Sequence, residues 1–178
     1  METIAYGKIT AENFFPTSLD SFVRRQEVHE CWRKVDGQWT LLPIAYVEDW
    51  GLEECRSFAQ AVLRGIRTGG TAFGAWAAGQ TVGFAFLAGA RSGSAGQYID
   101  LAEFYVSAPY QRRGIGRELF RLACRSARER GASKLYISAH SARESIAAYR
   151  KYGCVEAEEI NLLLAEKEPC DVQMEFRL

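Results

Sequence analysis

The amino-acid sequence predicts a mixed α/β fold of the α+β type. Apolar runs separated by turn residues follow one another early in the chain, whereas strands and helices alternate in the second half. The 178 residues, 48% of them hydrophobic, suffice for a substantial core. Because no internal repeat or linker is found, we expect residues 1–178 to form a single domain.

A hairpin and a helix are expected first. Asp36-Gly37 lies between apolar runs in Val28–Val47, and Asp-Gly is typical of the type I′ turn of a β-hairpin. Apolar residues then recur at helical spacing over Leu52–Ile66, with acidic residues in the first turn and arginines in the last. Gly69-Gly70 should end this helix.

Three strands are expected in the middle of the chain. Thr71–Ala77 and Thr81–Ala90 are predicted to pair in antiparallel fashion across a turn at Gly79. The loop Arg91–Gly96 is rich in glycine and serine, and it leads to a strand at Tyr98–Val106.

The second half should alternate helices and strands. A helix that starts at Ile115 and stops at Gly131 carries apolar residues on one face and arginines on another. After a strand at Lys134–Ala139, Ser141 and Glu144 match a capping box for a helix that runs to Gly153. Two strands should follow, at Cys154–Ile160 and at Val172–Leu178, the last with one buried face.

Composition argues against several classes of partner. Lys plus Arg equals Asp plus Glu at 22 each, so the general positive charge typical of a nucleic-acid-binding protein is missing. No apolar stretch approaches the ~20 residues that span a bilayer, and the N-terminus does not resemble a signal peptide. We expect a cytoplasmic protein without membrane partners. The five cysteines form no Cys-x-x-Cys pair, so we expect no disulfide framework and no metal site.

The segment Gln111–Gly116 predicts an anion-binding cradle. Gly114 and Gly116 lack Cβ atoms where a strand gives way to a helix, so the backbone and the free N–H groups of the first turn can approach a ligand. The helix dipole and Arg112, Arg113 and Arg117 favour a diphosphate. Neither the Gly-Lys-Ser/Thr of a P-loop nor the third glycine of a Rossmann fingerprint is present.

The stretch Leu101–Gly116, which reads LAEFYVSAPYQRRGIG, resembles the acetyl-CoA-binding motif of the GNAT superfamily of N-acetyltransferases. The resemblance implies the GNAT fold, a mostly antiparallel sheet with helices on both faces and a splay between the strands Tyr98–Val106 and Lys134–Ala139. It further implies acetyl-CoA as the cosubstrate. The residues that the resemblance places around it are Phe104, Tyr105, Val106, Gln111, Arg112, Arg113, Gly114, Ile115, Gly116 and Arg117.

The resemblance covers residues 44–178, most strongly 101–154, and leaves residues 1–43 as an N-terminal extension. We expect the hairpin of this extension to add to the sheet edge, to help build the acceptor pocket, or to form a homodimer contact. These three roles stay open at this level.

Catalytic candidates follow from the chemistry of an amine acceptor. An amine with a pKa near ~10.4 is protonated at neutral pH, so a base must remove a proton before attack on the thioester. Glu103 and Asp100 lie on the strand beside the cradle, and a regular strand would point them to opposite faces unless a bulge intervenes. We favour Glu103 slightly, and a water-mediated path is an alternative.

Tyr149 is the candidate acid. The segment Ser145–Gly153 resembles the family's second motif, in which a tyrosine protonates the departing CoA thiolate. The chain departs from the family pattern at Ala142, where asparagine is usual, and at Cys154, where phenylalanine is usual. These departures place one cofactor hydrogen bond in doubt.

The sequence thus predicts transfer of an acetyl group from acetyl-CoA to a primary amine of a small molecule or peptide by direct attack. The alternative is a CoA-binding regulatory module with weak catalysis, and a nucleic-acid-binding role for the arginine-rich helix is a weaker third. Carboxylates around residues 48–54 suggest a cationic acceptor, although favourable charge at a helix start explains them as well.

Overall fold

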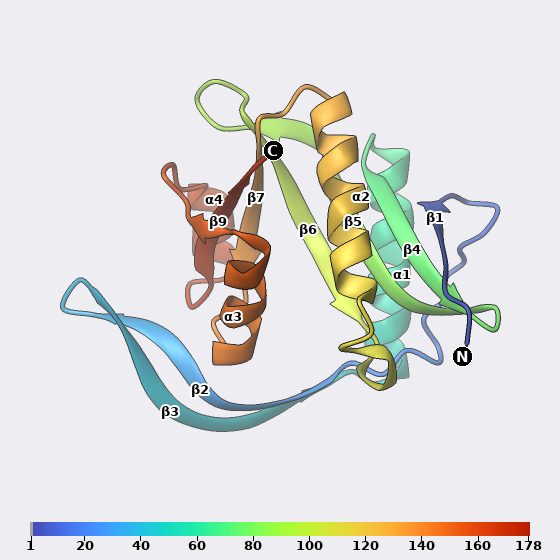
Figure 1. Ribbon diagram of the computed structural model, residues 1–178, viewed down its shortest axis with the longest axis horizontal. Helices are drawn as coiled ribbons and strands as arrows, with labels where there is room; N and C mark the ends of the chain where they lie inside the picture. Colours follow the sequence, from blue (N-terminus) through green and yellow to red (C-terminus); the bar gives the residue numbers. More distant parts are fainter. Residues whose placement is uncertain (1) are drawn as a thin grey trace.

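The computed structural model describes residues 2–178, and its centre is a seven-stranded sheet in the order β1–β4–β5–β6–β7–β9–β8 (Figure 1). β6 and β7 are parallel, and every other neighbouring pair is antiparallel. The strands of this sheet are β1 (Ala5–Ile9), β4 (Thr71–Ala77), β5 (Gln80–Ser92), β6 (Tyr98–Val106), β7 (Lys134–Ala139), β8 (Val155–Glu156) and β9 (Val172–Arg177).

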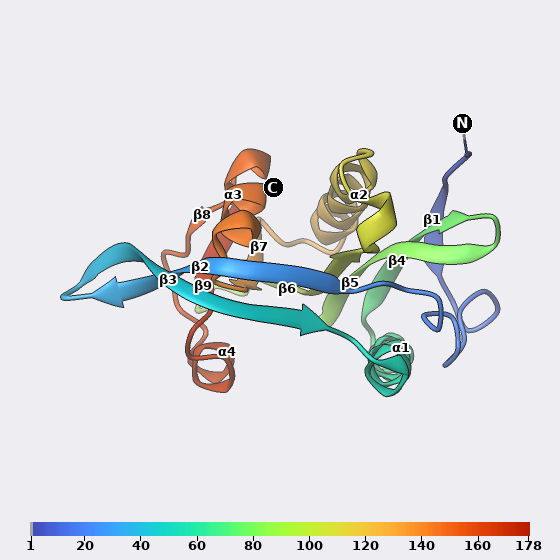
Figure 2. The same ribbon diagram turned by 90° about the horizontal axis from the view of Figure 1, so that it is seen from below.

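Helices cover both faces of the sheet, as expected. α2 (Ile115–Glu129) and α3 (Arg143–Tyr152) lie on one face, and α1 (Leu52–Arg67) and the short α4 (Leu162–Lys167) lie on the other (Figure 2). The largest apolar core packs α2 and α3 against the sheet, whereas a second core lies under α1. None of the helices in residues 2–178 is long and apolar enough to cross a membrane.

The splay between β6 and β7 is confirmed. The two strands pair only from Tyr98 to Asp100 on β6, opposite Lys134 to Tyr136 on β7. From Leu101 to Val106, β6 keeps its antiparallel partner β5 but has no strand beside it on the β7 side. A gap therefore opens in the middle of the sheet, and the main chain of Phe104, Tyr105 and Val106 borders it.

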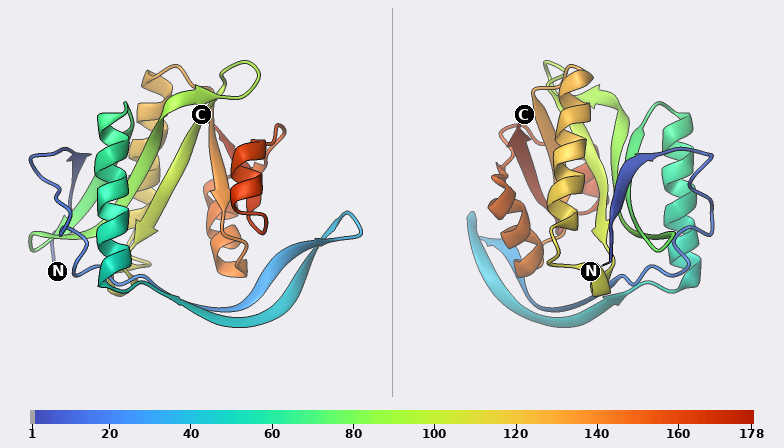
Figure 3. Two further views of the ribbon diagram at one scale, coloured as in Figure 1. Left: turned by 180° about the vertical axis from the view of Figure 1, so that it is seen from behind. Right: turned by 45° about the vertical axis from the view of Figure 1, so that its right-hand side comes forward.

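The predicted hairpin is present and is longer than expected. β2 (Arg25–Val35) and β3 (Gln38–Asp49) form a separate two-stranded sheet around a turn in which Asp36 and Gly37 both have positive φ. The hairpin passes beneath the splayed ends of β6 and β7 and reaches beyond α3 (Figure 3). It does not extend the main sheet, whose edge next to β4 is occupied by β1 instead.

The β7–α3 connection anchors the hairpin. Trp32 N donates to Ser141 O at 2.8 Å, and Arg33 Nη1 donates to Ser141 Oγ at 2.6 Å. Arg143 forms an ion pair with Glu30 at 2.6 Å. The predicted capping box is wrong, because Ser141 binds the hairpin and Ala142 is the N-cap residue of α3, without a side-chain cap.

Two further expectations differ from the structure near the C-terminus. The predicted strand Cys154–Ile160 shrinks to β8, and α4 follows it where no helix was expected. The last strand is buried on both faces, because the polar side chains of Gln173 and Glu175 are buried as well. Gln173 accepts a hydrogen bond from Tyr136, and Glu175 accepts one from Tyr98, so partners within the sheet compensate the lost hydration.

Candidate active site

The predicted cradle joins β6 to α2. After a short 3-10 turn at Ala108–Tyr110, the exposed residues Gln111 to Gly114 lead into α2, whose first residue Ile115 is buried. Arg112 and Gly114 both have positive φ, at 62° and 84°. Gly114 is the N-cap residue of α2, and a side chain would be strained there by the backbone conformation alone.

The second glycine of the cradle also lies against α3. A Cβ at Gly116 would lie 2.9 Å from Tyr152 Oη, so this glycine allows α3 to approach α2 closely. A Cβ at Gly114 would have no atom of the described residues within 4 Å, so the space beside this residue is open. Close approach of a ligand to the loop is therefore possible at Gly114.

The loop offers hydrogen-bond donors without acceptors. Within residues 2–178, the backbone N–H groups of residues 112–117 have no acceptor, and the first intrahelical bond of α2 runs from Glu118 N to Gly114 O at 3.1 Å. Arg113 lies over the Tyr110 ring at 4.9 Å, and Gln111 Nε2 donates to Val106 O at 3.1 Å. A loop of free N–H groups with exposed arginines at a helix N-terminus suits a diphosphate.

A β-bulge decides where the two candidate carboxylates point. Leu101 pairs with Leu87 and Glu103 with Phe86, so β6 carries an extra residue at Ala102. Ile99 and Leu101 before the bulge, and Phe104 and Val106 after it, all pack in the core under α2 and α3. Asp100 and Glu103 therefore both lie on the opposite face, toward α1 and α4, contrary to the expectation for a regular strand.

Glu103 is half-buried beside the gap, and no described residue forms an ion pair with it. Burial raises the pKa of Glu103 to about 7, while the Tyr105 side chain and the charge of Lys167 act in the opposite direction. A carboxylate with a pKa near neutrality can accept a proton and release it again at physiological pH.

Tyr149 approaches the gap from the other side of the sheet. It is half-buried on α3, and its ring lies 6.1 Å from that of Phe104 on β6. Burial raises the pKa of Tyr149, and negative charges that include that of Glu103 add to the increase. The phenol is thus protonated at neutral pH and can donate to a developing negative charge.

Aromatic side chains form one wall beside Glu103. Trp50 and Phe58 stack with their ring centres 4.0 Å apart, and the edge of Tyr105 meets Trp50 at 4.8 Å. Arg24 covers Tyr105 at 5.4 Å from the ring centre and pairs with Glu48 at 2.8 Å. Tyr105 links this wall to Glu103, because its side chain forms a hydrogen bond with the carboxylate.

The hairpin brings a polar cluster to the same end of the gap, and sequence analysis missed it. His140 Nε2 lies 3.1 Å from Glu48 Oε1 and 2.8 Å from the Tyr46 hydroxyl. The hydrogen bond with His140 lowers the pKa of Glu48. Burial raises the pKa of Asp171, which lies near this cluster at the start of β9. The only feature of the sequence that pointed to this cluster was the acidic character of residues 48–54.

The remaining candidate acidic residues have local roles. Asp49 pairs with Arg25 at 3.1 Å, and Glu54 accepts a hydrogen bond from Gly51 N at 2.5 Å at the start of α1.

The buried Cys124 and Cys154 have raised thiol pKa values because of burial, to about 11 and about 12. Such thiols are inert, as expected for small core residues.

Comparisons with known proteins agree with this architecture. The model of the Acetyltransferase (GNAT) family matches residues 27–154. The crystal structure of nourseothricin acetyltransferase has a TM-score of 0.72 at 16% identity, with 98% of each chain covered. A putative streptothricin acetyltransferase from Bacillus anthracis strain Ames, in complex with acetyl coenzyme A, has a TM-score of 0.70 at 13% identity, with 99% of each chain covered.

A third similar structure is the paia N-acetyltransferase of Thermoplasma acidophilum in complex with coenzyme A, with a TM-score of 0.62 at 16% identity and 99% of each chain covered. At these identities the solved structures show a common fold. No curated protein sequence matches this chain.

Proposed function

Because the chain belongs to the GNAT acetyltransferase family, we propose that it transfers an acetyl group from acetyl-CoA to a primary amine of a small molecule or peptide. The observation that carries this proposal is the position of a half-buried carboxylate, Glu103, beside the gap in the sheet and near enough to Tyr149 for its charge to raise the pKa of that phenol.

The described residues fit the cosubstrate. The cradle, Gln111 to Arg117, would hold the diphosphate through its free N–H groups and arginines. The unpaired edge of β6 at Phe104, Tyr105 and Val106 would bind the pantetheine arm as a neighbouring strand does. Acetyl-CoA supplies the activated acyl group as a thioester.

The side chains around the gap divide the proton transfers between them. Glu103 accepts a proton from the acceptor ammonium, which frees the nitrogen lone pair for attack. Tyr149 donates a hydrogen bond, and finally its proton, to the departing sulfur. The nitrogen loses its second proton as the amide forms, and a proton returned through solvent restores the phenol. The raised pKa of Tyr149 keeps this donor protonated until charge develops on the leaving group.

A small molecule is the first acceptor to test, because two of the similar structures are named as acetyltransferases of nourseothricin and streptothricin. The experiment is the release of CoA thiol from acetyl-CoA with a broad amine panel that includes these two compounds and peptide N-termini. Turnover with any amine supports the proposal. Tight binding of acetyl-CoA without turnover would instead favour the catalytically weak regulatory module.

Arg113→Glu should weaken acetyl-CoA binding by roughly ten- to a hundredfold, because it replaces a charge-assisted contact with repulsion at the diphosphate. Isothermal titration calorimetry measures the effect. Arg125→Glu is the matched control, since Arg125 is exposed further along α2 with only a 4.0 Å contact to Glu129. Equal affinities of the two variants would contradict the assignment of the cradle.

A further inference from the structure

Asp100 lies on the face of the sheet that α1 and α4 cover, without a cation of its own among the described residues. Its only hydrogen-bond partner among the described residues is Ser92 Oγ, at the long distance of 3.5 Å. No lysine or arginine within residues 2–178 pairs with it, and the side chain is half-buried. Burial raises the pKa of Asp100, as expected for a carboxylate that has lost water without gaining a charged partner.

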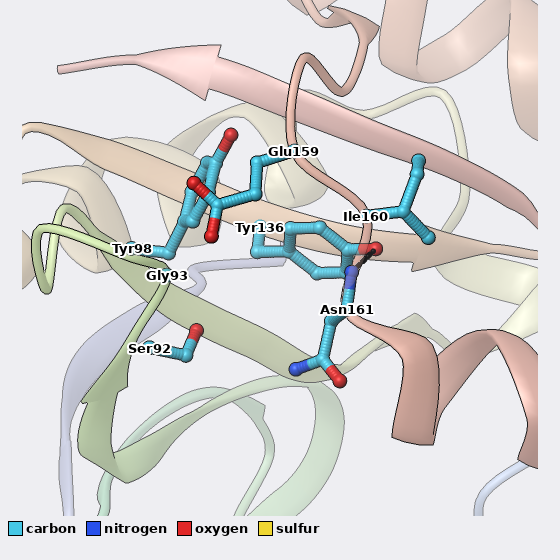
Figure 4. A pocket seen from close by; sticks show the side chains of 7 residues that line it. All are labelled: Ser92, Gly93, Tyr98, Tyr136, Glu159, Ile160 and Asn161. Atoms are coloured by element: carbon cyan, nitrogen blue, oxygen red, sulfur yellow. Dashed lines mark hydrogen bonds between the residues drawn. The ribbon is translucent and has the colours of Figure 1, made fainter.

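A polar cavity of about 230 Å³ adjoins this carboxylate. Ser92 and Asn161 lie on one side of it and Glu159 on another, with the Tyr136 ring between them (Figure 4). Ser92 is also the hydrogen-bond partner of Asp100, and the charge of Asp100 contributes to the raised pKa of Tyr136. Asp100 is therefore at the edge of the cavity.

The chemistry of the cavity suits a cation. Its lining contains hydroxyl groups, an amide, a carboxylate and two tyrosine rings, and none of the described lining residues is basic. Lys134 lies over the Tyr98 ring at 5.8 Å, so the free aromatic face is that of Tyr136. Hydroxyl and carboxylate oxygens accept hydrogen bonds from an ammonium group, and aromatic faces attract it. An anionic group would meet both Asp100 and Glu159 at this place.

The cavity and Glu103 lie on the same face of the sheet, since Tyr98, which lines the cavity, alternates with Ile99 in the same way as Asp100. Because of the bulge, Asp100 and Glu103 share a face of β6, and α1 and α4 border that face on either side (Figure 3). Asp100 and Glu103 are three steps apart along the strand, which places their Cα atoms about 10 Å apart at most. A flexible molecule of this length can reach both.

We propose that the acceptor is a dicationic amine, whose reacting nitrogen lies at Glu103 and whose second ammonium group is held by Asp100 at the edge of the Ser92–Asn161 cavity. This inference rests on the proposed function and specifies its substrate class. Asp100 is then a specificity-determining residue, whereas Glu103 accepts the proton.

The test compares α,ω-diamines, from propane-1,3-diamine to octane-1,8-diamine, with monoamines of the same chain length. We expect kcat/KM for the best diamine to exceed that of its matched monoamine by roughly ten- to a hundredfold, the value of one charge-assisted hydrogen bond. Asp100→Asn should remove most of this preference through KM. Asp20→Asn, at an exposed aspartate already paired with Arg56 at 2.7 Å, should retain it.

Three outcomes would overturn the inference. The first is that no diamine is acetylated, and the second is that diamines and monoamines react equally well. The third is that Asp100→Asn lowers kcat equally for all amines, which would make Asp100 the base. In each case, turnover of any monoamine or peptide leaves the proposed acetyltransferase function intact. Failure of the diamine inference can therefore be told apart from failure of the proposed function.

Discussion

Tyr149→Phe should lower kcat by about two to four powers of ten while acetyl-CoA affinity stays close to that of the unmodified protein. The substitution removes one hydroxyl group and keeps the ring that packs near Phe104. Without the phenol, the departing sulfur loses the proton donor that we propose for it. The substitution should therefore slow the chemical step. Steady-state kinetics and calorimetric titration of acetyl-CoA measure the two quantities separately.

The chain provides a matched control for this substitution. Tyr152 lies three residues further along α3, is also half-buried, and stacks on Phe120 with ring centres 4.8 Å apart. Tyr152→Phe removes a hydroxyl group from the same helix, one that lies against Gly116 of α2, and should retain kcat within a few-fold. If both variants lost activity equally, the effect would be one of helix packing, and Tyr149 would not be the acid.

Glu103→Gln should lower kcat by roughly two to four powers of ten, because glutamine cannot accept a proton. For the unmodified protein we expect kcat to rise with pH through a limb near pH 7. The pKa of Glu103 is about 7, and only the deprotonated carboxylate can act as base. The variant should lose this limb.

The measurement is a pH profile of kcat for both proteins at saturating amine. Glu129→Gln, at an exposed residue of α2, controls for the loss of one carboxylate and should keep both the rate and the limb. Persistence of the limb near pH 7 in Glu103→Gln would assign the titration to another group or to a water-mediated path. If Glu103→Gln kept the kcat of the unmodified protein, Glu103 would not be the base.

The contacts of the hairpin β2–β3 favour one of the roles expected for the N-terminal extension. It is bound to the β7–α3 connection through Ser141, and it brings Glu48 to His140 and Arg24 to Tyr105. Through these contacts the hairpin borders the acceptor side of the gap and supports the start of the helix that carries Tyr149. We propose that it helps to build the acceptor pocket.

The elements with local signals were the most predictable from sequence. The bounds of Tyr98–Val106 and Lys134–Ala139 agree with those of β6 and β7. The start of α2 was equally evident, because the glycine there reflects a local requirement for positive φ. The predictions were wrong where a residue forms hydrogen bonds with a segment far away in the sequence. Ser141 matches a capping box in sequence, but its hydroxyl group accepts a hydrogen bond from Arg33.

The sequence by itself predicted the glycine-containing loop at the start of α2 and the order of the elements from β2 to α3, since both depend on residues close together in the chain. Only the tertiary structure decided the face on which Glu103 and Asp100 lie, because the bulge at Ala102 depends on the register with β5. It likewise decided that the charge of Glu103 raises the pKa of Tyr149 and that burial raises the pKa of Glu103. Pairing register and burial are set by segments far away in sequence, and no local pattern encodes them.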